Sequence, residues 1–296
     1  MSTTDPFISI VVPSYNRAGF LDRNIPALLQ LQYDNYEVIV VDDGSTDDTA
    51  AVFEKYKAPN LHYYKKENGE RAAARNYGVA RAHGEYITFV DSDDELYPDA
   101  LKLAAVALRE KGYPSFMHMG YDIGTVDKVN KTINKIKDND PLIMVIGNPL
   151  SCMGVFVKRE VFEKHRFNED RKLSGSEDWE FWTRLAANYN LRTDDHVIGR
   201  LIEHDSRSVI SISEETLVRR MTLAMQYAFE DPAVQRIYGK HKDTMMAHWF
   251  TYVALHLAMD GLKKRAWYFV SQAMKEDATA LITKRGLVIM KLLLLK

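Results

Sequence analysis

The sequence contains one cysteine, Cys152, among 296 residues, and no long apolar run. A lone cysteine excludes an intramolecular disulfide framework and favours a reducing compartment. No stretch approaches the roughly 20 apolar residues that cross a bilayer. The apolar run near the N-terminus follows no basic segment, which disfavours a signal peptide. We therefore expect a cytoplasmic protein that does not span the membrane.

A large net charge is also missing. The formal charge of -2 provides no global field that would gather nucleic acid, so we expect no nucleic-acid partner. Hydrophobic residues make up 46% and charged residues 27%, which is typical of a globular protein with a sizeable core. The length predicts a main body with a smaller appendage.

Short apolar runs alternate with helical segments in the first third of the chain. This pattern predicts an α/β fold with a Rossmann-like, mostly parallel sheet flanked by helices. We expect strands at 8–12, 36–41, 61–64 and 86–90, and helices at 20–31, 46–56, 72–82 and 98–111. Pro26 falls inside the first helix and predicts a kink or a late helix start there.

The later pattern is less regular. Residues 112–151 predict a meander with a mobile surface loop, and residues 158–165 and 177–189 predict helices. From residue 214 onward helical spacing predicts four or five helices, among them 247–259 and 263–274. We place a boundary at 206–213, which gives a catalytic domain at 1–210 and a helical C-terminal region at 211–296.

Acidic residues follow two of the predicted strands. Asp42 and Asp43 follow the second strand, and Asp91, Asp93 and Asp94 follow the fourth. In open α/β sheets the ligand crevice lies at the carboxyl ends of the strands. Carboxylates gathered there repel one another unless a cation or another donor relieves them, and a divalent metal that holds a diphosphate does so.

A structural alternative exists for part of the first acidic cluster. Ser45 or Thr46 would cap the following helix, while Asp47 and Asp48 would favour the positive end of its dipole. The second cluster has a similar alternative, a plain loop ahead of the helix that begins near Pro98.

Four segments resemble the inverting family 2 glycosyltransferases: SIVVPSYNR, VDDGSTDDT, ENGERAAARNYGVARAHGEYITFVDSDD and SGSEDWEFW. The resemblance covers about residues 7–205 and implies a GT-A fold. It also implies a nucleotide-sugar donor, expected to be a uridine diphosphate sugar, with Mn²⁺ or Mg²⁺ as cofactor. The implied acceptor is a glycan or a lipid-linked glycan.

The resemblance assigns nucleotide contacts to the first motifs. Asp42 would hydrogen-bond the nucleobase, and Pro13 and Tyr15 would line the base pocket. Arg75 would lie near the nucleotide and Arg17 near the diphosphate. Tyr15 is alternatively a structural aromatic residue, and both arginines are alternatively surface ion-pair partners.

The DxD motif supplies the next assignments that the resemblance implies. Asp91 would face the ribose or the donor sugar, and Ser92 would contribute to the same donor site. Asp93 would bind the metal directly. His204 matches a position that is a third metal ligand in some GT-A enzymes. A hydrogen bond to phosphate or a structural role remains open for His204, and Arg207 is a candidate contact of the diphosphate.

The segment SEDWEFW resembles the acceptor-side motif of the family. It implies that Asp178 is the general base, with Glu177 and Trp179 on the acceptor side. The acidic pair alternatively decorates a helix N-terminus. Trp182 lies three residues beyond Trp179, and one of these two indoles is expected in the core.

The tail GLVIMKLLLLK carries lysines among apolar residues. Burial against the protein or a second subunit is the favoured interpretation, and contact with the inner face of the cell membrane is the other. Two further functions stay open, a noncatalytic subunit that binds sugar nucleotides and a sugar nucleotidyltransferase. The second is disfavoured because PSYNRAGF stands where a glycine-rich loop is expected.

Overall fold

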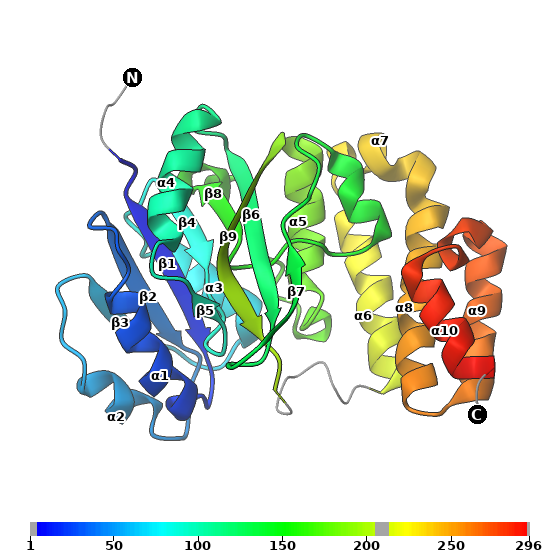
Figure 1. Ribbon diagram of the computed structural model, residues 1–296, viewed down its shortest axis with the longest axis horizontal. Helices are drawn as coiled ribbons and strands as arrows, with labels where there is room; N and C mark the ends of the chain where they lie inside the picture. Colours follow the sequence, from blue (N-terminus) through cyan, green and yellow to red (C-terminus); the bar gives the residue numbers. More distant parts are fainter. Residues whose placement is uncertain (1–4, 205–212, 295–296) are drawn as a thin grey trace.

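The computed structural model describes residues 5–204 and 213–294 and shows a mixed sheet with helices on both faces and more helices at one end (Figure 1). Within these residues the nine strands are β1 (Ile8–Ser14), β2 (Tyr36–Asp42), β3 (Leu61–Lys65), β4 (Tyr86–Phe89), β5 (Glu95–Leu96), β6 (Phe116–Gly124), β7 (Val129–Ile133), β8 (Val155–Lys158) and β9 (Leu191–Ile202). Their order across the sheet is β3-β2-β1-β4-β8-β6-β9-β5, and β7 pairs with β6 beside this path.

The helices cover both faces of the sheet and continue beyond its end. In chain order they are α1 (Ala18–Leu29), α2 (Thr49–Glu54), α3 (Glu70–Val79), α4 (Ala100–Glu110), α5 (Glu177–Asn188), α6 (Glu214–Ala228), α7 (Pro232–Tyr238), α8 (Lys242–Met259), α9 (Lys263–Asp277) and α10 (Lys284–Leu294). Short 3-10 turns include η1 (Pro141–Ile146), η2 (Arg159–Glu163) and η3 (Arg171–Leu173).

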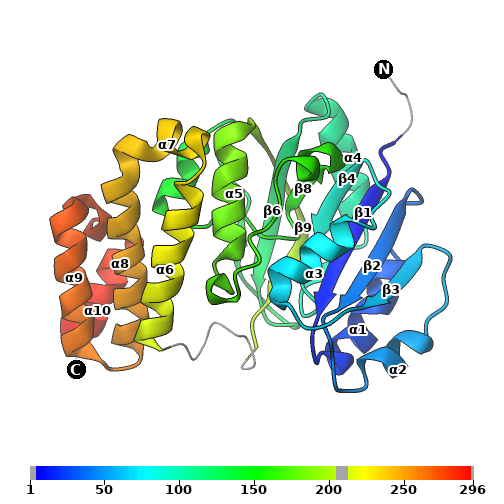
Figure 2. The same ribbon diagram turned by 180° about the vertical axis from the view of Figure 1, so that it is seen from behind.

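Alternate residues of β1 serve two different cores. Ile8, Ile10 and Val12 pack in one cluster with residues of α1 and α4, while Val11 packs in the other with residues of α3 and α5. This follows from the two-residue repeat of a strand, which sends successive side chains to opposite faces. The two views show α1 and α4 on one face of the sheet and α3 on the other (Figures 1 and 2). On the α3 face, Gly78 allows close packing, because an added Cβ would lie 2.5 Å from Val11 Cγ1.

The first four strands are parallel, as the sequence predicts, and their order creates a switch point. β1 pairs with β2 on one side and with β4 on the other, all in parallel. The chain runs outward from β1 through β2 to β3 and then returns to β4. Ligands of open α/β sheets bind outside the carboxyl ends of the strands at such a reversal. The loops after β1 and β4 are therefore the expected walls of a ligand site.

Pro26 lies inside α1, yet the late helix start that the sequence allowed is wrong, because the helix begins at Ala18. Proline lacks the N–H that would bond to the carbonyl oxygen of Asp22, four residues earlier. The Tyr56 hydroxyl donates to that oxygen at 2.9 Å. A side chain from the segment after α2 thus replaces the missing backbone hydrogen bond.

Two predictions for the middle of the chain are wrong. Residues 112–151 contain β6, a nine-residue strand in the sheet interior, rather than only a surface meander. β6 alternates apolar side chains with polar or small ones such as His118 and Asp122, yet almost all of it is buried, so its polar positions made it resemble a surface segment. The helix predicted at 158–165 is only the single turn η2, which directly follows β8.

The predicted helices of the C-terminal region are present as α6 to α10. The predicted boundary falls mostly on residues 205–212, which are outside the described part of the chain, as is Arg207. One face of α10 is buried, as expected for the tail, through Gly286, Ile289 and Leu293. Among the described residues, none of the helices is both long and apolar enough to cross a bilayer.

Candidate active site

A cavity of about 300 Å³ opens at the switch point of the sheet. The end of β1 and the loop after it contribute Pro13, Ser14, Tyr15 and Arg17 to its lining. The loop after β4 contributes the stretch from Asp91 to Asp93. The structure therefore brings six of the eight residues predicted for the donor and the first metal ligand to one cavity, which we call the donor cavity. The other two, Asp42 and Arg75, lie behind its surface.

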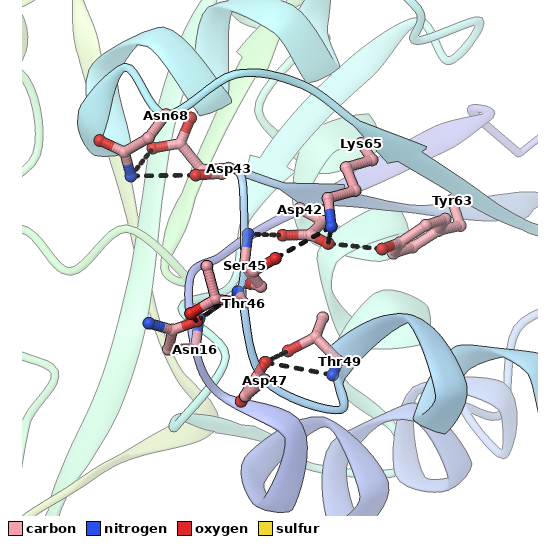
Figure 3. Close-up of polar contacts among 10 residues, drawn as sticks. All are labelled: Asn16, Asp42, Asp43, Ser45, Thr46, Asp47, Thr49, Tyr63, Lys65 and Asn68. Atoms are coloured by element: carbon pink, nitrogen blue, oxygen red, sulfur yellow. Dashed lines mark hydrogen bonds and ion pairs between the residues drawn. The ribbon is translucent and has the colours of Figure 1, made fainter.

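Asp42 is fully buried and its carboxylate is held by the fold itself (Figure 3). Its Oδ1 accepts the Ser45 backbone N–H at 2.7 Å, and its Oδ2 accepts the Tyr63 hydroxyl at 2.5 Å. The Lys65 ammonium lies 3.9 Å from Oδ2. With both oxygens engaged and no place in the cavity lining, Asp42 shapes the loop after β2 and does not face a ligand in this arrangement.

The neighbouring Asp43 does line the donor cavity. Its Oδ1 lies 2.8 Å from the Lys66 ammonium and accepts the Gly69 N–H at 2.9 Å. Its Oδ2 accepts the Asn68 side-chain amide at 3.2 Å (Figure 3). The motif VDDGS pointed to this position, but choosing the first of two adjacent carboxylates required knowing which strand residue faces inward. β2 ends at Asp42, whose side chain points into the protein.

The capping pattern also differs from the expected one. Asp47, not Ser45 or Thr46, accepts the first N–H of α2, through its Oδ1 to Thr49 at 3.1 Å. Its Oδ2 accepts the N–H of Ala18 at the start of α1, at 3.0 Å. One carboxylate thus joins the beginnings of two helices that flank the donor cavity.

Further lining residues escaped the motif-based assignment. Ser14 is buried, and its hydroxyl has no hydrogen-bond partner among the described residues, so it is available to a ligand. Glu70 and Arg71 line the cavity from the first turn of α3. The positive end of this helix dipole favours a negatively charged group. Arg71 was detectable as the residue one helical turn before Arg75.

A buried asparagine of α1 holds the loop that carries Asp91 and Asp93 through two hydrogen bonds. The Asn24 amide of α1 donates to the carbonyl oxygens of Ser92, at 2.6 Å, and Asp94, at 2.7 Å. Asn24 is only 4% exposed. Both N–H groups of the Asn24 amide are used, so the backbone of the loop that carries Asp91 and Asp93 is held in one conformation.

Asp93 and His204 meet at the rim of this loop. His204 Nε2 lies 3.0 Å from Asp93 Oδ2, and the His204 ring packs 4.9 Å from the Phe20 ring. No group of three or more histidine, cysteine or acidic ligands is present in residues 5–204 and 213–294. A carboxylate with an imidazole suits a divalent cation that takes its remaining ligands from phosphate and water. The pair fits that role.

Arg75 forms a buried bridge between two acidic side chains. Its Nη2 lies 2.8 Å from Asp91 Oδ1, and its Nη1 lies 2.9 Å from Glu177 Oε1. Arg75 is 2% exposed and its guanidinium lies over the Phe167 ring. Burial opposes its charge, but Cys152 and the surrounding carboxylates leave the pKa of Arg75 well above its ordinary value. Arg75 is therefore an internal ion-pair partner, neither a surface residue nor a lining residue.

Glu177 also lies inside the protein. Its second carboxylate oxygen accepts the Gly175 N–H at 2.5 Å. Burial alone would raise the pKa of Glu177, but Arg75 and Arg71 outweigh it and lower that pKa. Glu177 was predicted to contact the acceptor; instead it is buried in this network, where it orients the start of α5.

A second cavity, also of about 300 Å³, lies between the start of α5 and the C-terminal helices, and we call it the acceptor cavity. Asp178 and Trp179 line it from α5, and Trp249 lines it from α8. Trp179 and Trp249 meet edge to face at 5.3 Å. Trp182 is fully buried in the core, which confirms that one of the two α5 indoles serves packing.

The Asp178 carboxylate is held in place but remains able to accept a proton. Its Oδ1 accepts the Trp179 N–H and its Oδ2 accepts the Asn148 amide, both at 2.8 Å. Burial, together with the adjacent Glu177 charge, raises the pKa of Asp178 to about 6. A carboxylate with this pKa is ionised at neutral pH and is a stronger base than an ordinary aspartate.

The two cavities are joined through side chains. Asp91 lines the donor cavity, Arg75 connects it to Glu177, and the next residue, Asp178, lines the acceptor cavity. A carboxylate that can accept a proton thus lies on one side of the Arg75 bridge, and the donor cavity with Asp93 lies on the other.

A protein-family comparison matches residues 9–166 to glycosyl transferase family 2. The chain belongs to this family. An uncharacterized glycosyltransferase of Haemophilus influenzae is 34% identical over 167 residues, which cover 55% of this chain and 66% of that protein. One of Rickettsia conorii is 28% identical over 209 residues, which cover 67% of this chain. The match spans 33% of the Rickettsia protein, so this chain corresponds to about a third of its length.

Solved structures confirm the GT-A fold. S. aureus TarS 1-349 aligns over 96% of this chain and 83% of its own, with a TM-score of 0.66 and 21% identity. The mannosyltransferase PcManGT from Pyrobaculum calidifontis, in complex with GDP-Man and Mn²⁺, aligns over 99% of this chain and 86% of its own. Its TM-score is 0.59 at 20% identity.

Proposed function

We propose that this chain is an inverting glycosyltransferase that transfers a sugar from a uridine diphosphate sugar to a hydroxyl group of a glycan or lipid-linked glycan. The observation that carries the proposal is the position of Asp178. Its carboxylate, with a pKa raised to about 6, faces the acceptor cavity and is linked through Glu177 and Arg75 to Asp91 in the donor cavity.

The donor cavity supports the nucleotide assignment. Tyr15 is 48% exposed and offers an aromatic face to a base. The unsatisfied Ser14 hydroxyl and the first turn of α3 offer donors to polar and anionic groups. A solved structure of TarS in complex with UDP-GlcNAc, with a TM-score of 0.63, supports a uridine nucleotide as the first ligand to test.

The chemistry is a single displacement. The acceptor oxygen forms a bond to the anomeric carbon while the bond from that carbon to the diphosphate oxygen breaks. Asp178 takes the hydroxyl proton, and the nucleoside diphosphate leaves with the electron pair of the broken bond. Attack from the face opposite the leaving group inverts the anomeric carbon.

Asp93 and His204 are the residues that would hold a divalent cation. Manganese or magnesium there would offset the charge of the departing diphosphate. The Mn²⁺ in the PcManGT complex supports a metal-dependent donor site in this chain as well.

Calorimetry tests the donor site. We expect uridine diphosphate to bind the wild-type protein more tightly than guanosine or cytidine diphosphate, and only in the presence of Mn²⁺. Asp93→Ala should lose this binding. Asp48→Ala is a matched control, because Asp48 is exposed and its side chain caps no helix. If none of the three nucleotides binds the wild type, the proposal is wrong.

Catalysis is tested separately. Purified protein should transfer or hydrolyse the donor sugar with no other subunit present, and Asp178→Asn should remove transfer while leaving nucleotide binding intact. Nucleotide binding without any turnover would favour the noncatalytic alternative.

A further inference from the structure

Arginine side chains on the acceptor cavity differ from the other buried arginines of the protein. Arg220 of α6 and Arg285 of α10 both line this cavity. Arg75 and Arg184, by contrast, each form an ion pair with a carboxylate. Within residues 5–204 and 213–294, no carboxylate lies within ion-pair distance of Arg220 or Arg285.

Arg220 reaches the cavity beside the base. It is half-buried, and no hydrogen bond to its guanidinium is found among the described side chains and backbone. Gly175 makes room for it, because a Cβ at Gly175 would lie 2.7 Å from Arg220 Nη1. Gly175 also has a φ of +92°, which disfavours any other residue. The segment just before Asp178 is thus shaped to receive this guanidinium.

Arg285 is fixed by neutral partners. Its Nη1 donates to the His248 carbonyl at 2.9 Å and lies 3.3 Å from the Thr251 hydroxyl. Its Nη2 lies beside Gly147, where an added Cβ would be 3.5 Å away. The orientation of Arg285 is therefore fixed, and among the described residues its guanidinium forms no ion pair with a carboxylate.

The charges around the cavity favour an anionic ligand. Asp178 is the one carboxylate among the described lining residues, and its oxygens are already bonded to Asn148 and Trp179. Burial is the largest influence on both arginines and lowers the pKa of each. The Glu177 charge offsets part of this effect at Arg220, but no described carboxylate lies within ion-pair distance of either guanidinium, so a ligand anion that binds both would be favoured.

The remaining wall suits a sugar ring. Trp249 packs edge to face against Trp179, at 5.3 Å, and against Tyr252, at 5.7 Å. Aromatic walls with a few fixed polar groups are typical of small-ligand sites. We propose that the acceptor is an anionic glycan: its hydroxyl lies at Asp178, and a phosphate or carboxylate of the same or the adjacent sugar binds Arg220 and Arg285. This inference rests on the proposed function, since it names the substrate class of the same site.

The test is a binding titration that needs no donor. The indoles of Trp179 and Trp249 line the cavity, so ligand binding should change the tryptophan fluorescence. Glucose, glucose 6-phosphate and glucuronic acid share one ring and differ at a single carbon. We expect at least one of the two anionic sugars to bind about tenfold or more tightly than glucose, because charge-assisted contacts contribute that much. Binding of glucose 6-phosphate would identify phosphate as the recognised group, and binding of glucuronic acid would identify carboxylate.

Variants connect the preference to the arginines. Arg220→Met should weaken binding of the anionic sugar about tenfold or more, and Arg285→Met should weaken it in the same direction. Arg219→Met is the matched control, because Arg219 is the exposed neighbour on α6 and its loss changes the charge equally. The control should bind like the wild type.

Three outcomes would overturn the inference. Glucose could bind as well as the anionic sugars, or neither anionic sugar could bind at concentrations of tens of millimolar. Alternatively, Arg220→Met could weaken uridine diphosphate binding about tenfold in calorimetry, which would assign Arg220 to the donor. Unchanged uridine diphosphate binding in Arg220→Met supports the acceptor role. Failure of the wild type to bind uridine diphosphate concerns the proposed function alone, because the sugar titrations contain no nucleotide.

Discussion

Asp178 lies between a buried carboxylate and solvent, and this position determines the pH range in which it can accept a proton. Burial and the Glu177 charge raise its pKa to about 6, so it is protonated below that pH and ionised above it. We expect kcat/KM to fall about tenfold per pH unit below the apparent pKa. A pH–rate profile measures this, and Glu177→Gln should move the acid limb to lower pH because it removes a negative neighbour. An acid limb near the ordinary aspartate value in the wild type would contradict the assignment.

Asn24 is a positioning residue for the loop of Asp91 and Asp93. Asn24→Ala leaves the buried Ser92 and Asp94 carbonyls without their donor, which should lower the free energy of unfolding by about 1–3 kcal/mol. We also expect Mn²⁺-dependent nucleotide binding to weaken, because the loop loses these two hydrogen bonds.

Urea unfolding and calorimetry measure the two effects. Asn35→Ala is the control, because the Asn35 amide also donates to a carbonyl, that of Asp5, but is exposed. Equal nucleotide affinity in Asn24→Ala and wild type would show that the loop of Asp91 and Asp93 does not need the Asn24 hydrogen bonds for nucleotide binding.

At this scale the sequence identified the segments that line the two cavities but not always the side chains that face them. Asp91, Asp93 and Asp178 could be assigned because each stands in a motif with a distinctive order. Asp42 and Asp43 could not be distinguished, since a strand end directs adjacent side chains to opposite faces and the register is set by tertiary pairing. Arg75 was expected beside the nucleotide, but its two carboxylate partners are 16 and 102 residues away. No local sequence pattern indicates contacts between residues so far apart in the chain.

Helix α1 depends on a partner outside itself. The Tyr56 hydroxyl donates to the Asp22 carbonyl that Pro26 leaves free, and also lies 2.9 Å from the Asp22 carboxylate. Tyr56→Phe should lower the melting temperature by about one degree, because the contact is at the surface. In a Pro26→Ala background, where a backbone N–H is restored, the same change should have less effect. Calorimetric melting of the four proteins checks this; equal effects in both backgrounds would contradict it.

Arg75 connects α3, the loop after β4 and α5. Arg75→Met leaves Asp91 and Glu177 without their common cation, and Glu177 is 3% exposed. Removing one partner of a buried ion pair costs about 3–5 kcal/mol of unfolding free energy. Urea unfolding should report a loss of that order.

Two further variants test the reason for this loss. Arg75→Met combined with Glu177→Gln should recover part of the stability, because the stranded charge is gone. Arg192→Met breaks a surface pair with Asp138 and should cost little. If the buried and surface variants were equally stable, the bridge would have no structural role.

The elements that the sequence predicted well are largely apolar runs and segments with helical spacing. β1, β2 and β4 are such runs and are buried along their whole length, and the C-terminal helices have the helical spacing. β6 is interrupted by polar residues such as His118 and Asp122, and β9 carries charged residues at several positions. Their place in the sheet comes from pairing with each other and with β8 and β5, which are distant in sequence.

Taken as a whole, the molecule has an apolar outer surface on its last helix. Leu287 and Leu294 are 69% and 67% exposed, and Lys284 and Lys291 lie on the same helix. We keep contact with a membrane surface as a proposal for these exposed side chains, since lysines beside apolar residues are typical of helices that lie at a membrane surface.

Cosedimentation with phosphatidylglycerol vesicles tests the proposal. The wild type should bind such vesicles, and Leu287→Asp combined with Leu294→Asp should abolish binding without changing uridine diphosphate affinity. Binding by both proteins would exclude α10 as the contact. A concentration-dependent change in molecular mass that the double variant loses would instead assign the surface to a second copy of the chain.

The acceptor cavity could not be foreseen because its walls come from two separate stretches of the chain, residues 145–179 and 217–285. Asp178 was assigned from its motif, but Arg220 and Arg285 belong to helices that carry no motif. Only the packing of α6 against α5, of α8 against η1 and of α10 against α8 brings these groups together. The division into domains at residue 210 stays a proposal. The acceptor cavity is lined by residues from both sides of this boundary.

This boundary has an evolutionary consequence. The donor cavity is lined by residues from the first hundred positions, whereas part of the acceptor cavity is lined by residues after 213. Under the proposed function, exchange or drift of the last helices would alter acceptor binding and leave the cavity at the ends of β1 and β4 untouched. One nucleotide-binding segment could then be inherited almost unchanged by descendants that act on different acceptors.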